Sequence, residues 1–181
     1  MARDLLGCRI VRIDGALVRR GIIVEVEIYP GPHDRASHAF GFKKTQRNAA
    51  EYMQGGHAYI YCVYGMYWQL NISTGAKGYP SCVLIRAIDA GDTDIHRTNG
   101  PGKLCRWLGI DKNQYGLDLT VSSNLWIEER CRGRRSIRST PRIGIDYAGR
   151  EWAQKPLRLY LAEYEKQLPK LKSKYNTSID P

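Results

Sequence analysis

The sequence predicts a single α+β domain organised around a largely antiparallel β-sheet. Short segments alternate between apolar and polar residues, and this pattern is typical of strands with one buried face. Turn signals such as Asp14-Gly15 join neighbouring segments directly, which favours antiparallel pairing. The 181 residues contain no internal repeat and no clear linker. A chain of this length can bury a core of its own, so we expect one domain over residues 1–181.

The first half of the chain contains the clearest strand pattern. A short helix is expected over residues 2–6, followed by strands at 8–13, 17–20 and 22–29, the last two joined through Gly21. Alternation in the third strand places Ile22, Val24, Val26 and Ile28 on one face, and Ile23, Glu25, Glu27 and Tyr29 on the other. A loop opens at Pro30-Gly31-Pro32, and Thr45 can cap a short helix over 46–53.

The second half adds strands and one more helix. Strands are expected at 59–64 and 67–72, joined by a turn at Gly65-Met66, and at 82–88, 124–128 and 157–161. A helix is expected over 103–108. Residues 130–142 hold six Arg and are typical of a basic loop, and the polar residues 169–181 are typical of a frayed tail.

Charge and cysteine content narrow the function classes. Lys and Arg total 28 against 18 Asp and Glu, a net charge of +10, and such a surface attracts polyanions, most commonly nucleic acid. The five Cys are scattered without a C-x-x-C motif, which disfavours a disulfide framework or a zinc ribbon and suits a reducing compartment. Neither a P-loop, a G-x-S-x-G, a G-x-G-x-x-G nor a zinc-deaminase motif occurs.

Membrane association is not expected. Arg3 and Asp4 come where a signal peptide would need an apolar segment. Residues 52–76 lack charge, but their Gly, Gln and Asn residues and their alternation favour a buried hairpin over a membrane helix. A basic membrane-surface protein would need a basic amphipathic helix, which the sequence lacks.

Two clusters of residues are chemically suggestive. Glu25 and Glu27 share a strand face with Tyr29; they form either a solvated face or a general base beside an aromatic ring. Tyrosine is abundant, with twelve Tyr against two Phe, and four Tyr (59, 61, 64 and 67) lie in one predicted hairpin. They either reflect the strand preference of Tyr or stack on bases.

Two basic segments could bind phosphate. Asn99-Gly-Pro-Gly-Lys103 precedes the helix at 103–108, whose N-terminus could hold a backbone phosphate or could simply be a capped turn. The 130–142 segment is either a solvated loop or a phosphate contact.

Several motifs, taken together and in order, resemble one family over residues 2–160. They include Ala2-Arg-Asp-Leu-Leu-Gly7, Glu25-Val-Glu-Ile-Tyr29, Ala36-Ser-His38, Gly56-His-Ala-Tyr-Ile-Tyr61, Tyr64-Gly-Met-Tyr67, Val83-Leu-Ile-Arg86, Asn99-Gly-Pro-Gly-Lys-Leu-Cys105 and Pro141-Arg-Ile-Gly144. The chain resembles the alkyladenine (3-methyladenine) DNA glycosylases of the non-helix-hairpin-helix type.

The resemblance implies a role for each matching residue. Glu27 is expected to be the general base that activates water, which Arg86 and the carbonyl of Ile143 would hold. The flipped base would be sandwiched by Tyr29, His38 and Tyr61, and Asn71 would exclude the 2-amino group of normal guanine. DNA contacts are expected from Tyr64, which would fill the vacated stack, and from Met66, Tyr67, Arg47, Lys103 and Arg142.

The resemblance also implies the fold and the partner. The sheet would be curved, similar to the C-terminal domain of formyltransferases, and a β-hairpin would enter the DNA minor groove. Damaged double-stranded DNA would be the partner of a monomeric, intracellular enzyme that needs no cofactor and no metal. It would hydrolyse the glycosidic bond of alkylated or deaminated purines and leave an abasic site. The competing hypothesis is a nucleic-acid-binding module without catalysis.

Overall fold

One antiparallel sheet organises the computed structural model, which describes residues 1–129 and 135–175. Within that part of the chain the sheet has eight strands: β1 (Arg9–Asp14), β2 (Leu17–Tyr29), β3 (Ala58–Val63), β4 (Tyr67–Ser73), β5 (Cys82–Asp89), β6 (Leu125–Glu128), β7 (Ile137–Thr140) and β8 (Arg158–Leu161). The main order is β3-β4-β5-β2-β1-β6, and β8 joins β2 and carries β7. Every pairing is antiparallel.

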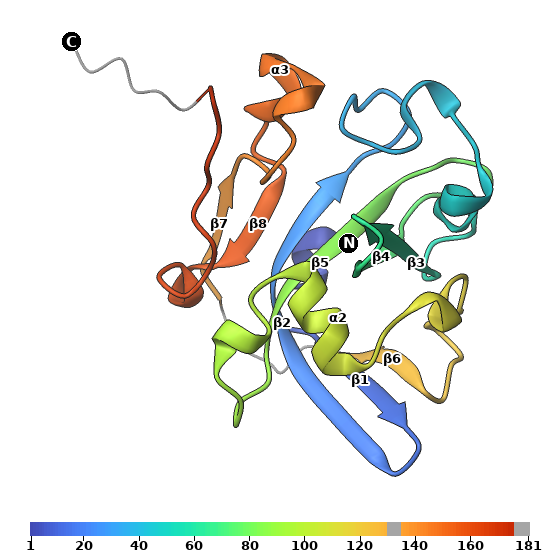
Figure 1. The fold of residues 1–181 in the computed structure, drawn as a ribbon, viewed down its shortest axis with the longest axis vertical. Helices are drawn as coiled ribbons and strands as arrows, with labels where there is room; N and C mark the ends of the chain where they lie inside the picture. The colour runs from blue at the N-terminus through green and yellow to red at the C-terminus, as the bar shows by residue number, and fades with distance from the viewer. Residues whose placement is uncertain (130–134, 176–181) are drawn as a thin grey trace.

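The long strand β2 gives the sheet its curl. Its first half pairs with β1, its second half pairs with β8, and β5 runs along its other edge. The β2–β5 register shifts on both sides of Glu25, and such bulges bend a strand and increase its twist. Gly21 permits the close approach of the two strands, since a Cβ there would lie 2.8 Å from Ile88 Cδ1. Figure 1 shows β2 and β5 crossing the middle of the molecule, with β7 and β8 to one side.

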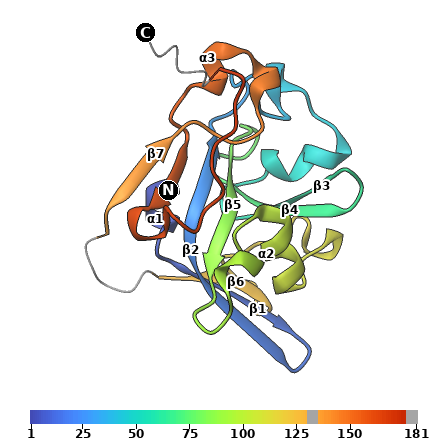
Figure 2. The ribbon, with the colours of Figure 1, turned by 60° about the vertical axis from the view of Figure 1, so that its left-hand side comes forward.

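The two faces of the β3-β4-β5-β2 region differ in character. One face carries apolar side chains such as Val26, Ile85 and Leu70, which pack in the main core together with the helix α2 (Pro101–Leu108). Each fully buried side chain of this kind contributes roughly 1.5–3 kcal/mol. In Figure 2, α2 lies in front of β4 and β5. The opposite face carries the polar and aromatic residues that line a cavity, described below.

Short helices complete the fold. Two are α-helical: α1 (Ala2–Leu5) and α3 (Arg150–Ala153). The others are 3₁₀ turns at Phe40–Phe42, Gln46–Tyr52, Ile95–Arg97, Lys112–Gln114, Asp146–Ala148 and Ala162–Tyr164. In the second of these turns, Asn48 Oδ1 accepts a hydrogen bond from the backbone N–H of Thr45 at 2.6 Å, so the predicted helix start is present. No helix among residues 1–129 and 135–175 has the length and apolarity needed to cross a membrane.

The α+β class and the antiparallel sheet are confirmed. The strands predicted at 17–20 and 22–29 form one continuous strand, β2, and the ends of the other predicted strands are displaced by at most two residues. Two local predictions are wrong. The segment 130–142 is not a single loop, because Ile137–Thr140 forms β7; residues 130–134 lie outside the described part of the chain. The tail is not frayed throughout, because Ser173 Oγ and the Lys174 N–H donate to the Asp146 carboxylate at 2.6 and 2.9 Å. Residues 176–181 are not described.

Candidate active site

Strand register brings together residues that lie far apart in the sequence. Glu27 on β2 is opposite Leu84 on β5, Leu84 is opposite Asn71 on β4, and Asn71 is opposite Tyr59 on β3. Directly opposed residues of an antiparallel pair point to the same face of the sheet. The row therefore places a carboxylate, an amide and a phenol on one surface.

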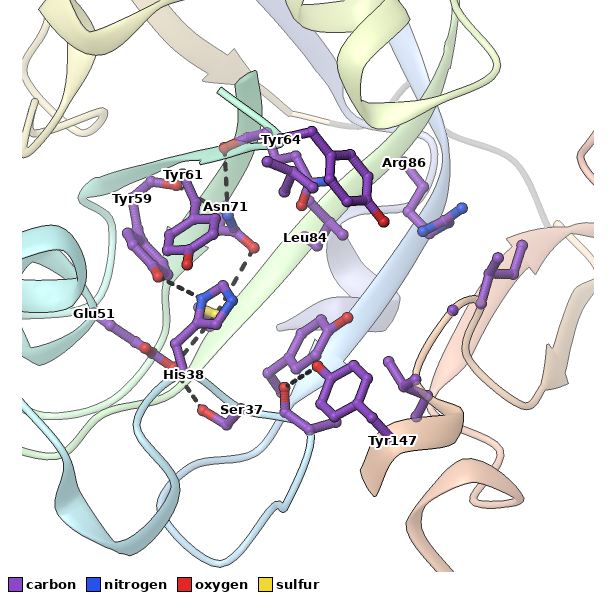
Figure 3. A pocket seen from close by; sticks show the side chains of 18 residues that line it. Ser37, His38, Glu51, Tyr59, Tyr61, Tyr64, Asn71, Leu84, Arg86 and Tyr147 are labelled. Carbon is purple, nitrogen blue, oxygen red and sulfur yellow. Dashed lines mark hydrogen bonds between the residues drawn. The ribbon is translucent and has the colours of Figure 1, made fainter. Parts of the chain in front are cut away.

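A cavity of about 350 Å³ lies on this surface, near the lower end of the size range of small-molecule sites, about 300–1,000 Å³. Its lining comes from four strands, β2 to β5, and from the loops and turns beside them, and Figure 3 shows how the side chains converge. The residues that line it are Tyr29, Ala36, Ser37, His38, Glu51, Tyr59, Tyr61, Val63, Tyr64, Gln69, Asn71, Cys82, Leu84, Arg86, Ile143, Gly144, Ile145 and Tyr147.

Glu27 lies directly behind this lining. Its side chain is fully buried. Oε1 accepts from the backbone N–H of Ile143 at 2.7 Å and lies 3.3 Å from Nη1 of Arg86, and Oε2 accepts from the Tyr29 hydroxyl at 3.1 Å. Hydrogen bonds and an adjacent guanidinium favour the charged form of a carboxyl group. The three residues that hold Glu27 all line the cavity, so its carboxylate is one side chain removed from the cavity space.

A second carboxylate, that of Glu25, offsets the positive charge of two buried arginines beside the site. Glu25 Oε1 accepts from Nε of Arg86 at 3.1 Å and from Nε of Arg158 at 2.5 Å, and all three side chains are buried. Two glutamates and two arginines together carry no net charge, which limits the cost of burying them. The alternative of a solvated strand face for Glu25 and Glu27 is therefore wrong.

The aromatic walls differ from a simple three-ring sandwich. His38 and Tyr61 stack on each other with ring centroids 3.8 Å apart and an interplanar angle of 24°. A base between two rings needs about 7 Å between them, twice the spacing of about 3.4 Å between stacked bases. His38 and Tyr61 therefore form one wall together. Tyr29 is the remaining ring of the predicted sandwich, and Arg142 packs over it with Cζ 4.6 Å from the ring centroid.

The electrostatic environment keeps His38 neutral. Desolvation in the pocket and the nearby Arg47 guanidinium lower its pKa to about 4, although the residue is accessible from the cavity mouth. Its Nδ1 lies 2.7 Å from the Tyr59 hydroxyl, whose own pKa is raised by burial. The pair therefore presents an uncharged polar edge near neutral pH.

Sequence reasoning missed Glu51, which also lines the cavity. Its residue is 1% exposed, and Oε1 accepts from Ser37 Oγ at 3.2 Å and from Cys82 Sγ at 3.6 Å. Oε2 is buried and has no hydrogen-bond partner among the described residues. Burial raises the pKa of Glu51 to about 7. The only sequence signal was a charged residue directly before the uncharged segment 52–76. Tyr147, on the cavity rim, was also missed; its hydroxyl donates to the Ala36 carbonyl.

The β3–β4 turn exposes apolar side chains beside the cavity. Tyr64 is 84% exposed and Met66 is 64% exposed, and Tyr67 is also exposed. Tyr64 has φ 53° and Gly65 has φ 70°, so the turn is one residue earlier than predicted. A left-handed conformation costs a non-glycine residue roughly 1–2 kcal/mol. Strain of this kind clusters at functional sites.

The predicted DNA-contact residues are not all on one surface. Tyr64 and Tyr67 form a shallow depression with Gly100–Lys103 at the N-terminus of α2, and Lys103 is exposed. Arg47 is also exposed and packs over Tyr61, with Cζ 4.4 Å from the ring centroid.

Arg142 does not fit this prediction. It is 1% exposed and forms a buried ion pair with Asp34, with Nη2 2.9 Å from Oδ1. A phosphate cannot reach it, so its assignment as a DNA contact is wrong. Its side chain instead anchors the loop after β2 and packs against the ring of Tyr29.

No group of three or more His, Cys, Asp or Glu residues that could hold a metal ion occurs in the described part of the chain. Cys62, Cys82 and Cys105 are free thiols.

Comparison with known proteins gives one consistent result. A family model described as Methylpurine-DNA glycosylase (MPG) matches residues 1–165. Similar proteins of Bacillus thuringiensis (strain Al Hakam) and Bacillus cereus (strain AH187) are each 42% identical over 88% of both chains. A protein of Bacillus anthracis (strain CDC 684 / NRRL 3495) is 41% identical over the same share. Each of the three bears the name "Putative 3-methyladenine DNA glycosylase".

Proposed function

The chain belongs to the methylpurine-DNA glycosylase family, and from this we propose that it removes alkylated and deaminated purines from double-stranded DNA by hydrolysing the bond between base and sugar. The lesions would be of the 3-methyladenine, 7-methylguanine, hypoxanthine and ethenoadenine class. The products are a free base and an abasic site. The protein would act as an intracellular monomer, with one DNA site per chain.

One observation carries the proposal: a fully buried carboxylate, Glu27, lies behind a tyrosine-walled cavity, held by three residues of its lining. Burial of a carboxylate is costly unless it is paired, and here the pairing leaves acceptor capacity. Among the described residues, Oε2 is contacted by the Tyr29 hydroxyl alone. A water at this oxygen would meet a carboxyl group that its partners already orient.

Access to the lesion requires that the base leave the duplex. A base inside the stack is out of reach, and extruding it costs a few kcal/mol, least for damaged pairs. Once flipped, the purine would lie between Tyr29 on one side and the stacked pair of His38 and Tyr61 on the other. A purine alkylated at N3 or N7 is cationic, and the aromatic faces attract a cation.

Hydrolysis would then proceed with Glu27 as the base. As the C1′–N bond breaks, positive charge develops on the sugar, and the anionic Glu27 stabilises it. Water attacks C1′ and gives its proton to Glu27. Arg86 and the carbonyl of Ile143 would hold this water. Both residues already contact Glu27, Arg86 through Nη1 and Ile143 through its backbone N–H.

Selection against normal guanine would come from Asn71. Its side chain is buried and fixed by Nδ2, which donates to the Tyr59 carbonyl at 3.1 Å. A fixed amide at the cavity floor leaves little room for an extra amino group on the base.

The strained turn between β3 and β4 would enter the DNA. Tyr64 would fill the space that the extruded base vacates, with Met66 and Tyr67 beside it, since apolar side chains inserted between base steps are common in minor-groove binding. Arg47 and Lys103, both exposed, would contact the phosphate backbone.

The test uses Glu27→Gln with duplexes that contain a single alkylated purine. Glutamine keeps the shape but cannot accept the proton, so we expect base release to fall by about 100-fold or more while lesion binding is retained. Free base is measured by chromatography and abasic sites by alkaline strand cleavage. Glu128→Gln is the matched control, because Glu128 lies on β6 and pairs with Arg9 at the surface. Release by Glu27→Gln at the wild-type rate would refute the assignment, and binding without any release by the wild type would favour a non-catalytic module.

A further inference from the structure

The cavity lining itself includes a carboxyl group, that of Glu51, whose environment differs from that of Glu27 behind the lining. Glu27 is surrounded by a guanidinium, a backbone N–H and a hydroxyl. Glu51 has no cation within ion-pair distance among the described residues, and its two hydrogen-bond donors, Ser37 and Cys82, both reach the same oxygen, Oε1. When two carboxyl groups share one site and their surroundings drive their ionisation apart, one is suited to act as the base and the other as the acid.

The hydrogen bonds of Glu51 match those of a neutral carboxylic acid. In that form one oxygen is a carbonyl acceptor and the other carries the proton. Oε1 accepts from Ser37 and from Cys82, which assigns it as the carbonyl. Oε2 is then the hydroxyl, buried and without an acceptor in the described protein. Figure 3 shows Glu51 and Ser37 beside His38 in the cavity.

We propose that Glu51 is the general acid that protonates uncharged purine lesions as they leave. The inference rests on the proposed glycosylase function and extends it. Alkylation at N3 or N7 makes a purine cationic, so such a base leaves without help. Hypoxanthine and ethenoadenine are neutral and need a proton.

The proton balance of the step is complete. The Oε2–H bond of Glu51 breaks and an N–H bond forms on the purine ring. The C1′–N9 bond breaks and its electron pair stays on the base, which departs neutral. Water forms the new bond to C1′ and gives a proton to Glu27. Glu51 then regains a proton from solvent, and Glu27 releases one to it.

The surroundings of Glu51 support protonation near neutral pH. Burial raises its pKa to about 7, a value suited to a general acid at neutral pH. The titratable groups that face it are Asp34, Tyr52, Tyr59 and Cys82. Asp34, which forms an ion pair with Arg142, also raises the pKa of Glu51. Burial raises the pKa values of Tyr52, Tyr59 and Cys82, so all three stay uncharged near pH 7.

The test compares a neutral with a cationic lesion in the same duplex sequence. Single-turnover release of ethenoadenine and of 7-methylguanine is measured for the wild type, Glu51→Gln and Glu51→Met. Both variants remove the proton, and the second also removes the polar group. We expect the ratio of the ethenoadenine rate to the 7-methylguanine rate to fall by about 100-fold in each. A variant that only disturbs the cavity would slow both lesions together and leave the ratio unchanged.

Two controls separate this proposal from the proposed function. Glu27→Gln should slow the release of both lesions, and Glu128→Gln, far from the cavity, should slow the release of neither.

The pH dependence gives a further test. Wild-type release of ethenoadenine should decline above about pH 7 as Glu51 loses its proton, and the decline should be absent in Glu51→Gln.

Three results would refute the proposal that Glu51 is the general acid. The first is a rate ratio within about threefold of the wild type in both variants, where a general acid should contribute about 100-fold or more. The second is a wild-type ethenoadenine rate that stays flat to about pH 9. The third is release of 7-methylguanine without any release of ethenoadenine by the wild type. These leave the glycosylase intact, whereas a wild type that releases neither base refutes both proposals.

Discussion

The buried Glu51 should make the stability of this protein depend on pH in a way that one substitution removes. The perturbation is Glu51→Gln. In the unfolded chain the carboxyl ionises near its ordinary pKa of 4.5, and in the folded protein burial raises that pKa to about 7. Below about pH 4.5 Glu51 is protonated in both states, so its raised pKa does not lower the free energy of unfolding. It destabilises the fold progressively as the pH rises towards 7.

The magnitude follows from the two pKa values. Each pH unit between them corresponds to about 1.4 kcal/mol, so above pH 7 the ionised Glu51 should cost the wild type about 3 kcal/mol. Glutamine has a similar shape and no charge. The free energy of unfolding of Glu51→Gln, minus that of the wild type, should therefore rise by about 3 kcal/mol between about pH 4.5 and about pH 7.5.

Urea unfolding at a series of pH values, followed by circular dichroism, measures this difference directly. All other titrating groups are shared by the two proteins and cancel. Glu128→Gln should show a difference that stays small across the range, since Glu128 lies in an accessible pair with Arg9. A Glu51→Gln difference that is flat with pH, or that falls as the pH rises, would show that Glu51 is not a buried neutral acid.

Three further outcomes are expected. Tyr64→Ala should lower the rate of lesion release by about tenfold while binding of undamaged duplex changes little, because the exposed ring would replace one stacked base; equal loss on damaged and intact DNA would refute the wedge role. Affinity for undamaged duplex should fall by about 100-fold or more between about 50 mM and about 200 mM salt in a titration, since phosphate contacts release counterions; a flat response would exclude the basic surface as the DNA site. Asp34→Asn should lower the free energy of unfolding by about 3–5 kcal/mol, because it leaves Arg142 buried without its anion; urea curves that superimpose on the wild type would contradict this.

Local sequence patterns predicted most of the sheet because strand signals are short-range. Alternation identified β2, and the turn residues around Gly15 and Gly65 identified its hairpin and the next one. The pattern failed for β7, where Ile137–Thr140 has no strong alternation and owes its strand to pairing with β8. Backbone pairing with a distant strand leaves no mark in the local sequence.

Arg142 was misplaced for a related reason. In a segment with six Arg, a solvated or phosphate-binding side chain was the reasonable expectation. Its burial depends on Asp34, more than a hundred residues earlier, and on the ring of Tyr29. Charge density predicts an average surface property, but it does not show which single cation finds a buried partner.

The sequence by itself determined most of the segments that become strands, the basic charge of the chain, and the motif residues, such as Glu27, that resemble one family of enzymes. Only the tertiary structure decided which side chains share a wall of the cavity and which donors and cations surround each of the two carboxyl groups. The reason is physical: protonation depends on burial and on nearby donors and cations. Those neighbours, Arg86 and Ile143 for Glu27 and Ser37 and Cys82 for Glu51, are brought together only when the strands and loops pack.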